Sequence, residues 1–70
     1  TKSDRRLKRN IVRVGKLRND INVYAYNYLW DAADAPKHIG VMADEVEHVI
    51  PAAVITDEHG YKSVDYSLLG

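Results

Sequence analysis

The sequence is organised around residues 3–11, which read Ser-Asp-Arg-Arg-Leu-Lys-Arg-Asn-Ile. This stretch places the hydroxyl group of Ser3 and the amine of Lys8 five positions apart within a strongly basic segment. A serine and a lysine together can act as a nucleophile and its general base. The same spacing also arises by chance in many proteins, and a solvated basic arm is the simplest alternative. The spacing therefore indicates a nucleophile–base pair without establishing one.

The residue pattern of the whole stretch is a more specific signal than the Ser3–Lys8 spacing. Its pattern Ser-Asp-x-x-Leu-Lys-x-Asn-Ile resembles the start of the endosialidase-type intramolecular chaperone domain of phage tail spikes and tail fibres, which has a related domain in myelin regulatory factor. Residues 38–47, followed by Pro51, resemble the family's Ile-Gly-x-x-Ala-Gln-Glu-Val segment, with Asp44 where glutamine is usual. Residues 60–66 resemble its Gly-Tyr-x-x-Val-Asp-Tyr segment. The family continues into a long helix, so we expect the domain to be truncated there at Gly70.

The resemblance implies a self-cleaving chaperone that acts as a homotrimer. Such a domain promotes folding of the fibre or spike segment that precedes it in the same chain. It then releases itself from the fibre, which implies that it acts in the host cytoplasm during virion assembly. The resemblance assigns catalysis to Ser3 and Lys8 and cleavage to a bond adjoining Ser3, either Lys2–Ser3 or Ser3–Asp4. Backbone N–H groups near Asp4 or Asn10 are candidate oxyanion donors.

Length and composition place this chain in a narrow class. Its 70 residues suffice for a single domain, residues 1–70, that buries roughly 60% of its unfolded surface, which is marginal without a partner, metal or disulfide. The absence of cysteine excludes disulfides and thiolate zinc sites. His38, His48 and His59 lack the spacing of a metal-binding pair, so we expect neither a metal nor another cofactor. No apolar run approaches the ~20 residues of a membrane span. Oligomerisation remains as the common way to stabilise so small a fold.

The net charge of zero conceals a strong asymmetry. Residues 1–18 hold eight basic residues and one acidic residue, a net charge of +7, whereas residues 19–70 hold two basic and nine acidic residues, a net charge of −7. A basic segment of this kind can bind nucleic acid. It can also dock on the acidic remainder, within one chain or between chains. We favour docking, because a separate nucleic-acid-binding arm does not require an acidic body that matches its charge.

Hydrophobic periodicity predicts an α+β fold with a small mixed or antiparallel sheet, hairpins and one short helix. Residues 21–30 alternate between an aliphatic face and a face of Tyr24, Tyr26, Tyr28 and Trp30, which we interpret mainly as packing rather than as a stacking site for a sugar or base. The predicted strands are 10–14, 21–30, 37–41, 53–56 and 61–65, the predicted helix is 43–50, and turns are predicted at 15–20 and 57–60. Residues 66–69 resemble the entry to a further helix, with Asp65 or Ser67 as its cap.

The proposed chemistry makes a demand on Lys8. A free lysine has a pKa of about 10.4, so a lysine base that works near pH 7–8 needs a pKa lowered by about 3 units. Like charge from Arg5, Arg6 and Arg9 would lower the pKa, and so would burial. In a hydrated arm both effects are small, so we expect the pair to become active only when the segment is packed, as in an assembled trimer.

The spacing also constrains the backbone. Five residues leave two side chains about 140° apart on a helix and on opposite faces of a strand, so neither element brings Ser3 to Lys8. Either the backbone turns between Asp4 and Leu7, or Ser3 of one chain meets Lys8 of another. His38 adjoins the central glycine motif and is a further candidate to approach Ser3. The competing class is a non-catalytic trimerisation module in which the same residues have structural roles; a nucleic-acid-binding arm is the least favoured reading.

Overall fold

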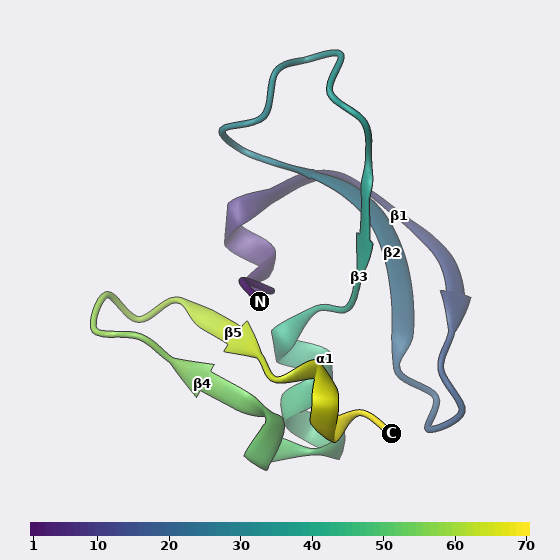
Figure 1. Ribbon diagram of the computed structural model, residues 1–70, viewed down its shortest axis with the longest axis vertical. Helices are drawn as coiled ribbons and strands as arrows, with labels where there is room; N and C mark the ends of the chain where they lie inside the picture. The colour runs from purple at the N-terminus through teal and green to yellow at the C-terminus, as the bar shows by residue number, and fades with distance from the viewer.

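The computed structural model describes residues 1–70 and has an α+β fold, as the periodicity predicts. A three-stranded sheet and a two-stranded sheet, both antiparallel, are joined by a short helix (Figure 1). The elements are β1 (Lys8–Lys16), β2 (Asn22–Tyr28), β3 (His38–Gly40), α1 (Ala43–Val49), β4 (Val54–Thr56) and β5 (Lys62–Val64), with 3-10 turns at Arg5–Leu7, Pro51–Ala53 and Tyr66–Leu68.

The strands of the β1–β2 hairpin extend further toward the turn than the sequence predicts. Gly15 and Lys16, expected in the turn, pair with Val23 and Asn22. The register shifts between Arg9 and Val12 and again between Arg13 and Gly15, so the strand bends at these irregularities. Periodicity alone cannot locate such shifts, because each one changes which residues face each other.

Strand β2 ends earlier than predicted, at Tyr28 rather than at Trp30. The backbone N–H of Asp31 donates to the carbonyl of Tyr28, and the Asp31 carboxylate accepts the N–H of Tyr28 at 2.9 Å. This turn takes Leu29 and Trp30 out of the sheet, and both are exposed. A carboxylate that captures a backbone N–H in this way competes with the sheet ladder and ends the strand.

The two faces of the first sheet have different environments. Tyr26, on the aromatic face, is 2% exposed. On the opposite face, Val12, Ala25 and Ile39 lie in one row across the three strands, and both Val12 and Ile39 are more than 60% exposed. Ile21 and Asn27, on the aliphatic face of residues 21–30, are buried, so this face is open only in part.

Helix α1 follows the prediction but ends one residue earlier, at Val49. Its first turn carries Asp44 and Glu45, which favour the helix through its dipole, and Pro51 begins a separate 3-10 turn. Val46 is buried, whereas Val49, one turn later, is half exposed. The core beneath the helix is a cluster of Ile21, Val41, Ala43, Val46, Ala53 and Val64.

Gly40 of the central motif lies where the chain passes two tyrosines. A Cβ at this position would lie 2.5 Å from the hydroxyl of Tyr66 and 3.2 Å from that of Tyr26. The Tyr66 hydroxyl also accepts the backbone N–H of Val41 at 3.0 Å. The glycine therefore lets β3 pass against tyrosines from β2 and from the C-terminal turn, which links the central and C-terminal motifs.

Residues 1–3 pair with β5, an arrangement that the sequence analysis does not foresee. The N–H of Ser3 donates to the carbonyl of Lys62, the N–H of Val64 donates to the carbonyl of Thr1, and Lys2 lies opposite Ser63. The N-terminus therefore lies between the two sheets rather than extending into solvent (Figure 1).

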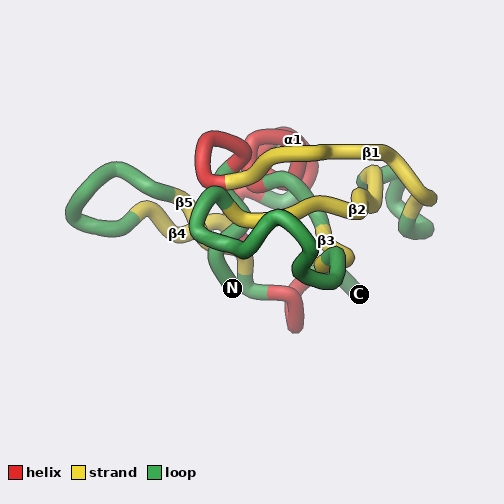
Figure 2. Tube along the Cα trace, turned by 90° about the horizontal axis from the view of Figure 1, so that it is seen from above, coloured by secondary structure: helices red, strands yellow, loops and turns green.

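The remaining turns agree with the prediction. Gly60 has a φ of 85° in the β4–β5 turn, and Asp65 caps the 3-10 turn by accepting the N–H of Ser67. The molecule is flat, with extents of 33 × 30 × 16 Å (Figure 2). No helix combines the length and the apolar composition that crossing a membrane requires.

Candidate active site

Residues 4–7 turn the backbone between the two candidate catalytic residues. Asp4 is the N-cap of the 3-10 turn Arg5–Leu7, and the N–H of Leu7 donates to the carbonyl of Asp4. Of the two arrangements that the spacing allows, the structure therefore contains the turn within one chain. After this turn, Lys8 begins β1 opposite Tyr28 of β2.

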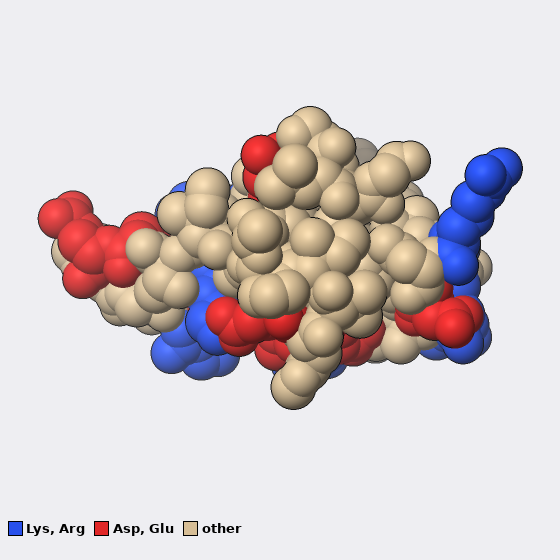
Figure 3. Space-filling model, turned by 90° about the horizontal axis from the view of Figure 1, so that it is seen from below, with Lys and Arg blue, Asp and Glu red and all other residues tan.

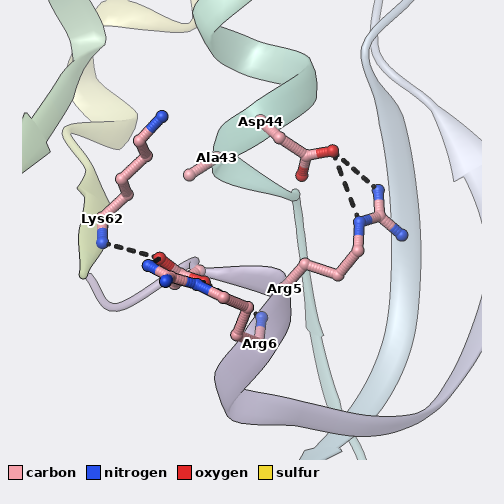
Figure 4. A pocket seen from close by; sticks show the side chains of 6 residues that line it. Arg5, Arg6, Ala43, Asp44 and Lys62 are labelled. Atoms are coloured by element: carbon pink, nitrogen blue, oxygen red, sulfur yellow. Dashed lines mark hydrogen bonds and ion pairs between the residues drawn. The ribbon is translucent and has the colours of Figure 1, made fainter. Parts of the chain in front are cut away.

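Asp4 holds this turn in place through contacts on both sides. Its carboxylate accepts the backbone N–H of Arg6, the guanidinium of Arg6 and the backbone N–H of Lys62 on β5, each at about 3.0 Å. The side chain is only 6% exposed, and its hydrogen bonds with Arg6 hold the pKa of the carboxyl well below its usual range. Figure 4 shows Lys62 and Arg6 on one side of the hollow that these residues line, and Arg5 reaching Asp44 on the other side.

Ser3 is completely buried, and both its hydroxyl and its backbone carbonyl have hydrogen-bond partners. Its hydroxyl donates to the carbonyl of Thr1 at 3.2 Å, and its backbone carbonyl accepts the N–H of Ala43 at 2.8 Å. The hydroxyl is thus turned back along its own chain, across the Lys2–Ser3 peptide bond. The carbonyl on the other side of Ser3 is fixed to the start of α1.

Lys8 is 5% exposed and lies over an aromatic ring. Its Nζ donates to the carbonyl of Val41 at 3.0 Å and lies 3.7 Å from the centroid of the Tyr26 ring. The pKa of Lys8 is lowered to about 8, chiefly by burial and also by the positive charge of Arg5, while Asp4 and Asp44 partly oppose the change. Both causes were expected from the sequence, and burial is the larger of the two.

Ser3 and Lys8 converge on the same short piece of backbone. The carbonyl of Ser3 is bonded to Ala43, and Nζ of Lys8 is bonded to Val41, two residues earlier. No hydrogen bond joins the Ser3 hydroxyl to Lys8 Nζ; each group donates to a backbone carbonyl instead. Proton transfer between them requires both side chains to turn from these carbonyls toward each other.

The three arginines near Lys8 have different roles. Arg5 pairs with Glu45 at 2.8 Å and with Asp44 at 3.3 Å, which places part of the basic segment on the acidic first turn of α1. Arg6 pairs with Asp4, and Arg9 donates to the carbonyl of Asp31. Of the three, Arg5 lowers the pKa of Lys8. Docking within one chain, one of the two readings of the charge asymmetry, is therefore present at Arg5.

A family model described as chaperone of endosialidase (Peptidase_S74) matches residues 3–55, which is more than half of the chain. The chain belongs to this family. The match begins at Ser3 and includes Lys8 and the central motif around Gly40, whereas the Gly-Tyr-x-x-Val-Asp-Tyr motif lies outside it. Neither the curated proteins nor the solved structures contain a match to the chain.

Two further candidates lie apart from Ser3 in this member of the endosialidase-chaperone family. His38 pairs with Asp31 at 2.9 Å and lies against the rings of Tyr26 and Tyr28, without a hydrogen bond to Ser3. Asn10 has a φ of 55°, is exposed, and directs its amide toward Asn27. His38 can reach the site only through the tyrosines, and Asn10 serves the bend in β1.

Tyr28 is not among the site residues predicted from the sequence. The hydroxyl of Tyr28 donates to the carbonyl of Lys2 at 2.8 Å, and this carbonyl belongs to the peptide bond that precedes Ser3. The tyrosine face was interpreted as packing, which describes Tyr26 but omits this contact. The hairpin pairing of Lys8 with Tyr28 would have revealed it, but the register shifts in β1 hide that pairing from a periodicity analysis.

Proposed function

We propose that this domain is a self-cleaving intramolecular chaperone. It promotes the trimerisation and folding of an upstream phage tail fibre or spike segment of the same chain. It then cuts a bond adjoining Ser3, with Ser3 as nucleophile and Lys8 as base, and leaves the mature fibre. In this proposal it acts in the host cytoplasm during virion assembly.

The observation that carries the proposal is the buried amine of Lys8. A lysine with a pKa of about 8 is roughly one-tenth neutral at pH 7, whereas a free lysine is neutral in only about 0.04% of molecules. The gain in the basic form is therefore about 200-fold. Burying an ionisable amine lowers stability unless other interactions offset the cost, and such groups cluster at functional sites.

The geometry around Ser3 favours cleavage of Lys2–Ser3 over cleavage of Ser3–Asp4. The Ser3 hydroxyl lies on the N-terminal side of its own residue, bonded to Thr1. The carbonyl of Ser3, which would be attacked in the alternative, is bonded to Ala43. We therefore assign the reacting carbonyl to Lys2.

The reaction then proceeds in two covalent steps. Neutral Lys8 takes the hydroxyl proton of Ser3, and Oγ attacks the carbonyl carbon of Lys2. The C–N bond of Lys2–Ser3 breaks, the nitrogen of Ser3 receives the proton from Lys8, and an ester joins Lys2 to the Ser3 oxygen. Water opens the ester, which gives a carboxylate on Lys2 and restores the hydroxyl of Ser3 beside its new free amine.

The exposed aliphatic row of the first sheet supports association between copies of the chain. Val12 and Ile39 are each more than 60% exposed on the two edge strands, on the same face of the sheet, and a domain of this size buries little apolar surface by itself. A homotrimer that covers this row would gain apolar burial that the single chain lacks.

The test is cleavage of a chain that carries its upstream segment, followed by denaturing gels, intact mass and sedimentation. The expected result for the wild type is two fragments, and the mass of the smaller fragment should be that of a chain that begins at Ser3. Ser3→Ala should leave one fragment and an intact trimer, whereas Ser67→Ala, which removes an exposed hydroxyl from the C-terminal turn, should cleave normally. A Ser3→Ala chain that is still cut would remove Ser3 from the nucleophile's role.

A non-catalytic trimerisation module is the second candidate. The observation in its favour is that the Ser3 hydroxyl and Lys8 Nζ each bond to a backbone carbonyl and not to each other. In that case the wild-type chain remains a single fragment under conditions in which it is trimeric. The same gels therefore separate the two candidates.

A further inference from the structure

The carbonyl of Lys2 makes no hydrogen bond to the neighbouring strand β5. On either side of Lys2, the backbone of Thr1 and Ser3 bonds to β5, so Lys2 and Ser63 form a pair without mutual hydrogen bonds. The N–H and carbonyl of such a residue point away from the paired strand. The carbonyl next to the Ser3 nucleophile is therefore held rigidly by its neighbours and directed toward the other sheet.

The hydroxyl of Tyr28 occupies the position that this carbonyl faces. It donates to the oxygen of Lys2 at 2.8 Å, across 26 positions of the chain. The Tyr28 ring is stacked on Trp30 at 4.6 Å between centroids, and it also lies 4.8 Å from the ring of His38. These contacts fix the direction of the hydroxyl, as preorganised stabilisation of a developing charge requires.

Tyr28 also lies beside the proposed base. It pairs with Lys8 across the β1–β2 hairpin, and Nζ of Lys8 is 5.9 Å from the Tyr28 ring centroid. The cross-strand pair of Lys8 and Tyr28 thus combines an amine that can remove a proton with a hydroxyl that can bind the oxygen that becomes negative. The hydroxyls of Tyr24 and Tyr26 have other partners, Glu45 for Tyr24 and Tyr28 for Tyr26.

We infer that Tyr28 is a catalytic residue, the hydrogen-bond donor that stabilises the oxyanion formed on Lys2 during cleavage of Lys2–Ser3. This inference rests on the proposed self-cleavage and adds to it the residue that activates the carbonyl. When Oγ of Ser3 attacks, the electrons of the carbonyl double bond move to the Lys2 oxygen, and the Tyr28 hydroxyl donates to it without losing its proton. When the C–N bond breaks, the electron pair returns and the carbonyl forms again as the ester.

The same donor serves the second step. Water attacks the ester carbonyl of Lys2, and the negative charge develops on the same oxygen. The contact between Tyr28 and Lys2 is exposed to solvent, so water can reach this carbonyl without opening the core. Tyr28 therefore accelerates both ester formation and ester opening.

The test compares Tyr28→Phe with Tyr24→Phe in the chain that carries its upstream segment. Tyr28→Phe removes one hydroxyl and keeps the ring that packs on Trp30, and we expect cleavage to slow by about 100-fold, at the lower end of the effect of losing an oxyanion donor. Tyr24→Phe removes a hydroxyl from the same face of β2 and should cleave at the wild-type rate. The rate is measured from the appearance of the released fragment after refolding.

The pH profile distinguishes a catalytic role from a structural one. The rate of Tyr28→Phe should rise with pH around the same midpoint as the wild type, near 8, because Lys8 sets that midpoint, while its plateau is lower. A shift of the midpoint together with the loss of rate would mean that Tyr28 acts by packing against Lys8, and would overturn the inference. So would a Tyr28→Phe chain that cleaves as fast as the wild type while Ser3→Ala remains uncut.

A second substitution keeps the inference testable if Tyr28→Phe does not fold. Incorporation of 3-fluorotyrosine at position 28 keeps the ring and hydroxyl and makes the phenol a stronger hydrogen-bond donor. Below the pKa of that phenol, cleavage should be faster than in the wild type, and an unchanged rate would exclude Tyr28 as the donor. If the wild-type chain with its upstream segment is not cut at all, the proposed function fails, and the inference fails with it.

Discussion

The two halves of the basic N-terminal segment each carry three basic residues, but only the first half contains buried residues, although its Arg5 and Arg6 are exposed. In residues 3–8, Ser3, Asp4 and Lys8 are each at most 5% exposed. In residues 9–16, which form most of β1, Arg13 and Lys16 are exposed. Figure 3 shows a basic side chain that extends from the end of the molecule with the β1–β2 turn, with acidic atoms beside it, and acidic atoms at the end with the β4–β5 turn.

The difference arises from the partners that the fold supplies. The first half meets backbone groups of residues 41, 43 and 62, and acidic side chains of α1. The second half faces β2, whose side chains offer Arg13 a single exposed hydrogen bond, to Asn22. A count of charges therefore does not predict which lysine or arginine is buried, whereas the availability of fixed acceptors does.

The largest expected effect separates the two lysines of these halves. Lys8→Arg should reduce cleavage by at least about 10³-fold, because a guanidinium stays protonated and cannot accept the Ser3 proton. Lys16→Arg, at the other end of β1, should cleave at the wild-type rate. The fragment yield after refolding measures both, and normal cleavage by Lys8→Arg would mean that another group is the base.

The next effect concerns stability and compares two aspartates. Asp4→Ala should lower the free energy of unfolding by about 2–4 kcal/mol, because it removes the cap of the 3-10 turn and leaves the partly buried N–H of Lys62 without this partner. Asp44→Ala, which loses an exposed pair with Arg5, should cost less than about 1 kcal/mol. Urea denaturation measures both values. Equal losses would show that the buried half is not held by its acceptors.

Asp4 also predicts a loss of stability in acid. Its pKa is lowered in the folded chain, so the folded state binds this proton less readily than the unfolded state. The stabilisation is present above the unfolded pKa of about 3.9 and is lost as the pH falls below it. Asp4→Asn should remove this part of the acid dependence, and urea denaturation at several pH values measures it.

The sequence predicts the elements of this fold better than their pairing. The helix at residues 43–49, the β4–β5 hairpin and the turn at Gly60 follow from local patterns, and the motif that contains Ser3 and Lys8 lies within the family match. Pairing of residues 1–3 with β5 depends on contacts across about 60 positions, for which local patterns carry no signal. The role of Tyr28 depends on a register that irregularities in β1 conceal.

A smaller effect follows from the pKa of Lys8. The cleavage rate should rise about tenfold per pH unit below 8 and level off above it, because the rate follows the neutral fraction of the amine. A rate that is flat between pH 6 and 8 would mean that the neutral amine of Lys8 does not limit cleavage.

The smallest expected effect compares Arg5 with Arg13, one arginine from each half. Arg5 lies close enough to lower the pKa of Lys8, and it also neutralises Asp44 and Glu45. Arg5→Ala removes the like charge and leaves two carboxylates unpaired, and both changes favour the protonated amine. The midpoint of the rate profile should therefore move upward by a fraction of a pH unit, since burial, the larger cause, remains.

Arg13→Ala is the matched control, because Arg13 is exposed, lies in β1 beyond the bend and has no contact with Lys8. Its midpoint should equal that of the wild type. If both variants move the midpoint equally, the amine responds to the net charge of the whole segment, and the partition of this segment into a buried functional half and a solvated half is wrong. If only Arg5→Ala moves the midpoint, the distance of the arginine from Lys8, and not the net charge of the segment, sets the pKa of Lys8.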